Sequence, residues 1–173
     1  MKTALLARLG ALTMVAVTAA AGVASPDAPS DSFKAALTGA VRSTISGKAT
    51  FGWVGNESGA PEVFTLSLGT DSSRGAVLFT RARSGELKVR SYTVSDIGHG
   101  FDEVQALVML GRADRPEGVF RARSGTLTIR SVSDHVITGH FAGDATGFLK
   151  SAPEREDQQV YISGSFTARA GAR

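Results

Sequence analysis

The stretch 124–143 constrains the fold more than any other part of the chain, because strand periodicity and turn chemistry agree in it. Apolar residues and a glycine occupy alternate positions on both sides of a short turn, at Leu127, Ile129, Ile137, Gly139 and Phe141. The turn contains Ser133 and Asp134, which are residue types that favour turns. The stretch therefore predicts a β-hairpin with one buried face. An isolated hairpin is only marginally stable in water, so the remaining chain must supply further strands.

The same alternation predicts strands on both sides of this hairpin. We expect them at 41–54, 64–68, 75–81, 88–94, 104–110 and 159–168. Segment 101–110 also fits a helix, because its apolar run is continuous and periodicity alone cannot decide such a case. Strands on both sides of it and Gly111 at its end favour the strand.

These strands predict an all-β fold with a single domain. We expect about eight mostly antiparallel strands in sequential order, arranged as an up-and-down barrel or as a two-sheet sandwich. Glycines at 47, 139 and 164 share the inward parity of their strands. An inward glycine lets a strand bend sharply while a nearby phenylalanine of the same strand covers the backbone, which favours a strongly coiled, barrel-like sheet. The sandwich remains the alternative.

The N-terminus has the layout of a secretory signal peptide. Lys2 and Arg8 precede an apolar run that ends in small residues, so residues 1–24 predict a segment removed after Ala24 or after Ala21. The mature protein would then be secreted or periplasmic, with no membrane span. Residues 25–40 are interpreted as a linker containing at most a short helical turn or two, and 41–170 as the β-rich domain.

Composition excludes some classes of partner. The chain carries 19 lysines and arginines against 16 acids, but Lys2 and Arg8 lie in the signal segment, so 17 basic residues and a charge of +1 remain. This balance gives no argument for nucleic-acid binding. The chain has no cysteine, so no disulfide can staple the fold.

The sequence contains no motif for catalysis, metal or cofactor binding. Its histidines are His99, His135 and His140, and the last two have opposite parity in the hairpin. A metal site needs three or four convergent ligands. No nucleophile elbow and no phosphate-binding glycine loop occur. We therefore expect no cofactor and no enzyme, although scattered carboxylates could still be paired in space.

A repeated segment supplies the candidate binding residues. Arg-Ala-Arg-Ser-Gly occurs at 81–85 and again at 121–125. If the two copies lie side by side, Arg81, Arg83, Arg121 and Arg123 would form a basic patch suited to an anionic glycan or to envelope phosphates. The alternative, which we favour, is that these arginines solvate strand surfaces.

Several strand motifs resemble those of a group of exported bacterial β-rich proteins of uncharacterised function. The motifs are Ser-Gly-Thr-Leu-Thr-Ile at 124–129, Ile-Thr-Gly-His-Phe at 137–141 and Ile-Ser-Gly-Ser-Phe at 162–166. This resemblance implies a β-rich fold and export. It implies no catalytic residue.

Three functions are compatible with these observations. The first is an exported, non-catalytic module that binds a ligand or a cell-envelope component. The second is a structural or adhesive envelope protein whose faces or edges pair with copies or partners. The third is a hydrolase that uses scattered carboxylates. An apolar cavity open at one end would favour the first function, and an exposed apolar face the second.

Overall fold

The computed structural model describes residues 31–55, 63–69, 74–81, 86–97, 100, 102–153, 155 and 157–171. This part of the chain is all-β and contains no helix. The predicted signal peptide and the first residues of the predicted linker lie outside it. Of the described residues, none belongs to a helix long and apolar enough to span a membrane.

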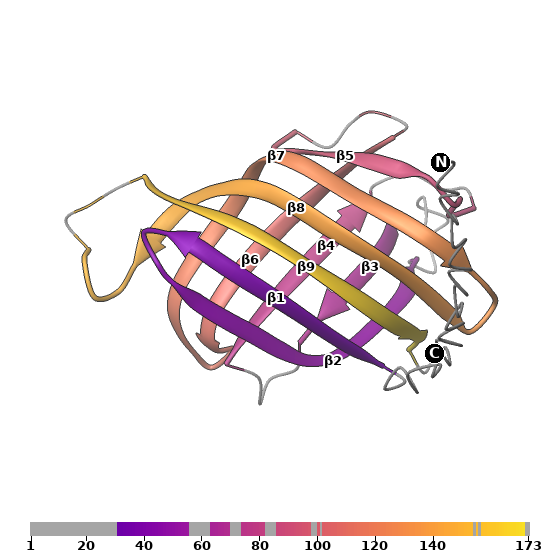
Figure 1. Cartoon of the computed structure of the whole chain (residues 1–173), viewed down its shortest axis with the longest axis horizontal. Coiled ribbons are helices and arrows are strands. Elements are labelled where there is room, and N and C mark those ends of the chain that lie inside the picture. The colour runs from indigo at the N-terminus through magenta and orange to yellow at the C-terminus, as the bar shows by residue number, and fades with distance from the viewer. Residues whose placement is uncertain are drawn as a thin grey trace, which may run out of the picture.

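In the described part of the chain, nine strands form one sheet that closes in a ring (Figure 1). They are β1 (Ser32–Gly39), β2 (Ser43–Val54), β3 (Val63–Leu68), β4 (Gly75–Arg81), β5 (Ser91–Ser95), β6 (Glu103–Arg112), β7 (Arg115–Val132), β8 (Val136–Leu149) and β9 (Gln158–Ala170). Their order around the ring is β1-β2-β3-β4-β6-β5-β7-β8-β9, and β9 pairs again with β1. The predicted hairpin is present as β7 and β8. The strands do not separate into the two sheets of a sandwich.

The ring departs from the predicted up-and-down order at β5, which lies between β6 and β7. The long strand β7 pairs first with β6 and then with β5. Short parallel contacts join β5 to β6, and β2 to β9 beyond the start of β1. The sheet is therefore mixed, and its nine strands are not in simple sequential order.

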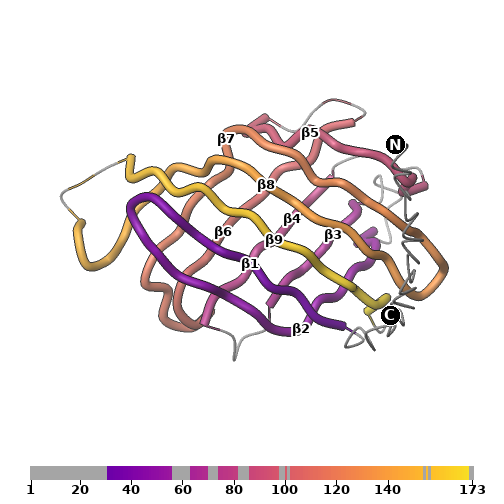
Figure 2. Tube along the Cα trace, in the orientation of Figure 1, coloured from indigo at the N-terminus to yellow at the C-terminus, as the bar shows by residue number. Residues whose placement is uncertain are grey.

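Strand β1 corrects the predicted linker. Phe33, Ala35 and Leu37 are buried and alternate with exposed Lys34 and Ala36. The alternation is weak in the sequence, because alanine occurs on both faces. Figure 2 shows β1 lying between β2 and β9, where it closes the ring. The β domain therefore begins before residue 41.

Strand β6 confirms the choice of strand over helix at 104–110. Its inward residues are Val104, Ala106, Val108 and Leu110, and all four are buried. Its outward residues Leu107 and Met109 are half-buried. The continuous apolar run in the sequence thus arises because both faces of this strand are apolar.

Side chains fill the interior of the ring. The core consists of the inward residues of all nine strands, and Phe79 packs edge-on against Phe141 with ring centroids 5.2 Å apart. The void left among Val77, Phe79 and their neighbours measures about 10 Å³. A single water needs about that volume, so this space is too small for an organic ligand.

Two inward glycines on neighbouring strands are each covered by a phenylalanine of the other strand. Gly139 on β8 lies opposite Phe166 on β9, and Phe141 lies opposite Gly164. A Cβ atom added to Gly139 would lie 2.7 Å from Cζ of Phe166, and one added to Gly164 would lie 2.8 Å from Cζ of Phe141. The sequence predicted cover by the phenylalanine of the same strand. The structure places it on the adjacent strand, because directly opposed residues are closer than residues two apart along one strand.

We predict that Gly139→Val and Gly164→Val each lower the free energy of unfolding by about 1–3 kcal/mol, because the added atoms overpack the core. Gly52→Val is the matched control, since a Cβ atom there would have no atom within 4 Å. Urea denaturation of the three variants measures the effect. Equal urea midpoints for all three variants would contradict the packing of each glycine against the phenylalanine of the adjacent strand.

Candidate functional site

Arg81, the first of the predicted binding residues, lies inside the ring. It ends the inward series of β4 after Gly75, Val77 and Phe79, and it is 5% exposed. Its guanidinium carbon lies 5.6 Å from the centre of the Tyr92 ring. A cation over an aromatic face is stabilised by the ring quadrupole. Arg81 therefore packs as part of the end of the core.

Tyr92 connects this buried arginine to the surface. The guanidinium of Arg90 lies 5.0 Å from the centre of the same ring, and Arg90 also forms an ion pair with Asp102. The Tyr92 hydroxyl accepts a hydrogen bond of 2.8 Å from the Lys88 amide. These contacts hold the segment before β5 against the ring, which is a structural role.

Arg121 and Arg123 lie on the outer face of β7, beside the inward residues Phe120 and Ala122. Arg121 donates to the carbonyl oxygen of Asp96, and Arg123 forms an ion pair of 2.9 Å with the Asp96 carboxylate. The structure thus brings these two arginines together around one acid.

The described arginines do not meet on one surface. Arg81 faces inward, whereas Arg121 and Arg123 face outward, and β6 lies between β4 and β7. Arg83 lies outside the described residues. Arg81 and Arg121 are the first residues of the two identical pentapeptides, and they face opposite ways because Arg81 occupies an inward position of β4 and Arg121 an outward position of β7.

A concavity lies at the end of the ring where β1 turns into β2. Four parts of the chain surround it: the turn after β1, the end of β6, the start of β7 and the end of β8. The lining residues are Ala40, Val41, Leu110, Glu117, Leu149, Lys150 and Ser151. Its volume is about 530 Å³. We call it the ring-end pocket; the β1–β2 turn that borders it is at the left of Figure 1.

Backbone contacts fix the walls of the ring-end pocket. The Ala40 amide donates to the carbonyl of Gln159 at 2.9 Å, which ties the β1–β2 turn to β9. The preceding residue, Gly39, has φ +105, a conformation that favours glycine. The Lys150 amide donates to the carbonyl of Glu117 at 2.8 Å. The pocket is therefore formed by anchored turns.

The chemistry of the ring-end pocket is amphipathic. Val41, Leu110 and Leu149 supply apolar contacts and belong to the core or pack against it. Glu117 and Lys150 are exposed and supply one charge of each sign. Sequence reasoning missed this site, because its residues come from four separate segments. The only signal was the inward parity of Val41.

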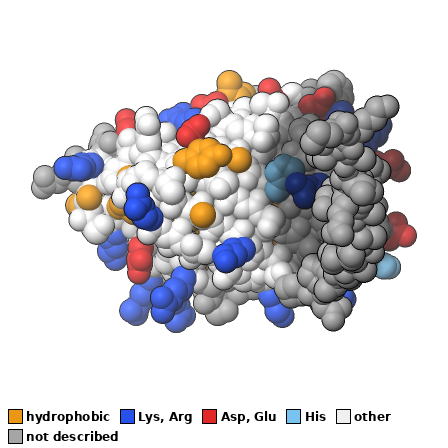
Figure 3. Space-filling model, viewed as in Figure 1, with side chains coloured by type: hydrophobic (Ala, Val, Ile, Leu, Met, Phe, Trp, Pro, Cys, Tyr) orange, Lys and Arg blue, Asp and Glu red, His pale blue; other side chains and the backbone are white. Residues whose placement is uncertain are grey.

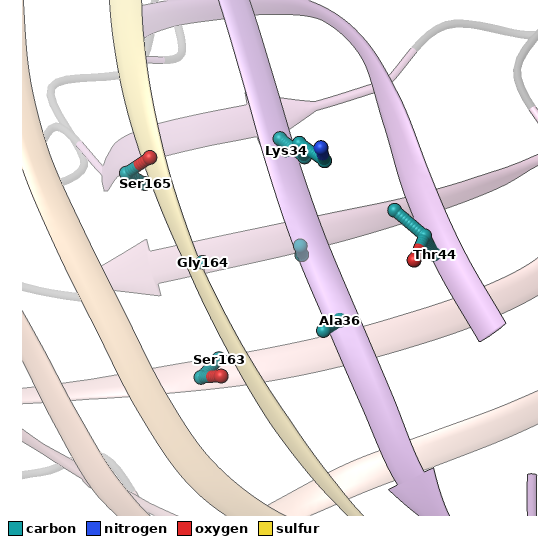
Figure 4. Close-up of a pocket in the computed structure, with 7 residues that line it drawn as sticks. Lys34, Ala36, Thr44, Ser163, Gly164 and Ser165 are labelled. Atoms are coloured by element: carbon teal, nitrogen blue, oxygen red, sulfur yellow. The ribbon is translucent and has the colours of Figure 1, made fainter. Parts of the chain in front are cut away.

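A second depression lies on the outer face, over β9, β1 and β2. It measures about 280 Å³ and forms where Ala36 and Gly164 leave low relief. Figure 4 shows Lys34, Thr44, Ser163 and Ser165 spread along the three strands around it, without a common point of convergence. This face of the molecule carries scattered lysine, arginine and acidic side chains and a small apolar patch (Figure 3). The depression offers few polar groups that could fix the orientation of a ligand.

The part of the chain that the structure describes contains no group of three metal-ligating side chains. His140 lies on the outer face of β8 between Thr128 and Ser165, and His135 lies exposed in the β7–β8 turn. His99 lies outside the described residues. Neither placed histidine contributes to the ring-end pocket.

Comparison with known proteins provides no relative. No family model, no curated protein and no solved structure matches the chain. The resemblance of its strand motifs to exported bacterial β-rich proteins therefore stays a prediction. The proposal for its function therefore rests on the residues and pockets of this chain alone.

We predict that Arg81→Ala lowers the free energy of unfolding by about 1–3 kcal/mol, because it removes a buried side chain that packs on Tyr92. Arg121→Ala, in the second copy of the repeat, should change it by less than about 0.5 kcal/mol, since this side chain is exposed. Thermal and urea denaturation of both variants would reveal the difference. Similar small effects for the two variants would show that Arg81 does not stabilise the ring.

Proposed function

We propose that the chain is an exported binding protein that holds a small amphipathic ligand in the ring-end pocket. Ligand sites in closed β-sheets are found at their mouths, and they combine apolar walls with a few polar groups. The void among the described core side chains around Val77 and Phe79 has a volume of only about 10 Å³, so a ligand would bind at the end of the ring and not in this void.

The observation that carries this proposal is the composition and size of the ring-end pocket. Its volume of about 530 Å³ falls in the range of roughly 300–1,000 Å³ that is usual for small-molecule sites. Val41, Leu110 and Leu149 offer an apolar surface, and Lys150 offers a cation at its edge. Together they suit a compact molecule with an apolar body and an anionic end.

The lining argues against a glycan as the ligand. Sugar rings commonly stack on aromatic side chains, and none of the seven residues that line the ring-end pocket is aromatic. A fatty acid, or the acyl part of a cell-envelope lipid, matches the lining better. Its chain would lie against the three aliphatic residues and its carboxylate or phosphate would reach Lys150.

The same lining favours binding over catalysis. Glu117 is its one carboxylate, and no histidine is present. Hydrolysis by paired carboxylates needs a second acid within reach. An acid and a base of fixed roles are therefore lacking among the residues that line the ring-end pocket.

We predict that the wild-type protein binds dodecanoate and that Ser151→Trp weakens this binding at least about tenfold, because the indole fills the pocket. Ser151 is exposed, so the fold should tolerate the change. Isothermal titration calorimetry measures the affinity. Thr44→Trp, which adds the same side chain beside the outer depression, should leave the affinity unchanged.

Lys150→Gln provides a second test of the orientation of the ligand. It should weaken the binding of dodecanoate and leave the binding of uncharged dodecanol unchanged, because only the carboxylate contacts the ammonium group. Absence of binding in the wild type, or equal affinities in wild type and Ser151→Trp, would overturn the proposed function.

A further inference from the structure

A row of apolar side chains crosses the outer face of four neighbouring strands. Ala76 on β4 lies opposite Met109 on β6, Met109 lies opposite Val119 on β7, and Val119 lies opposite Phe148 on β8. We call these four residues the outer row. Leu78 and Leu107 form a second opposed pair beside it. Outward positions of an antiparallel sheet are usually polar when they face water.

The outer row is accessible at the surface. Phe148 is 51% exposed, and Ala76, Met109 and Val119 are half-buried. Strand β9, which pairs with β8, carries Ser163, Ser165 and Thr167 at outward positions together with Tyr161, which is 45% exposed. The outer row is thus a continuous line of apolar side chains across four strands, and exposed apolar patches are typical of protein contact surfaces.

Charged residues flank the outer row in a self-complementary order. On one side Glu117 on β7 and Lys150 after β8 are neighbours, joined by a backbone hydrogen bond. On the other side Arg121 on β7 lies opposite Thr146 on β8, and Asp144 follows. Each of the two strands thus has opposite charges on the two sides of the row. All four charged residues are exposed.

We propose that this face binds a second copy of the chain, with a two-fold axis running along the outer row. Such an axis places Val119 on Val119 of the second copy, and it exchanges the two sides of the row. Arg121 then faces Glu117 of the second copy, and Lys150 comes to the side that carries Asp144. An isologous interface of this kind uses each complementary pair twice.

The charge pattern favours a second copy over a lipid surface. An anionic membrane attracts an apolar face that is flanked by basic residues. Here Glu117 and Asp144 flank the row together with Arg121 and Lys150, so charges of both signs flank it. Charges of opposite sign on the two sides of the outer row instead favour one orientation of a second copy relative to the first.

Sedimentation velocity over a range from micromolar to near-millimolar concentration tests the proposal. We expect a reversible monomer–dimer equilibrium in the wild-type protein. Val119→Lys should raise the dimer dissociation constant at least about tenfold, because it places two like charges at the axis. Thr44→Lys, beside the outer depression, should leave the constant unchanged. A wild-type monomer at every concentration overturns the proposal, whether or not the protein binds anionic vesicles.

A charge-exchange experiment tests the orientation. Arg121→Glu alone and Glu117→Arg alone should each weaken the dimer, since each brings like charges together. An equimolar mixture of the two variants should form a heterodimer at least about tenfold more stable than either homodimer. Native mass spectrometry distinguishes the three species. A statistical mixture without preference for the heterodimer would overturn the pairing of Arg121 with Glu117. The readout is assembly of the ligand-free protein, so it can succeed or fail independently of the proposed function.

Discussion

The fold depends on filling the interior of a small closed sheet with alternate side chains from nine strands. Closure requires strands to bend, and a glycine at an inward position permits the bend but leaves the backbone uncovered. The pairs Gly139–Phe166 and Phe141–Gly164 allow the bend and also cover the backbone. Each of the two strands supplies one glycine and one phenylalanine, and each phenyl group covers the glycine of the neighbouring strand. This exchange fixes the register of β8 against β9. A shift of one residue would place every inward side chain of one strand outside.

Local patterns in the sequence predicted those elements that alternate strictly or have clear boundaries. The β7–β8 hairpin combines strict alternation with a turn, and β6 is bounded by strands and by Gly111. Strand β1 could not be recognised, because Ala35 faces inward and Ala36 outward. The insertion of β5 between β6 and β7 could not be predicted either. It depends on how far the long strand β7 extends past the start of β6, which is a property of the closed ring and not of any segment.

The candidate binding residues illustrate the same limit. Arg-Ala-Arg-Ser-Gly has the same composition at 81–85 and 121–125, yet Arg81 is buried on Tyr92 and Arg121 is bound to Asp96 at the surface. Whether a side chain points inward or outward depends on its position in the alternation of its own strand. A repeat therefore predicts a shared surface only when both copies begin at positions of the same parity. The ring-end pocket is less predictable still, since the β1–β2 turn, the β6–β7 hairpin and the end of β8 are far apart in sequence.

The ring-end pocket and the outer row share one residue, which links the two proposals. Glu117 lines the pocket and also flanks the row. If Arg121 of a second copy pairs with Glu117, that carboxylate becomes less available to repel the anionic end of a ligand held at Lys150. Binding of the ligand would then favour the dimer, and by thermodynamic reciprocity the dimer would bind the ligand more tightly. A single acid between the two sites is sufficient for such coupling, because the charges involved lie within a few residues of one another on β7 and at the end of β8.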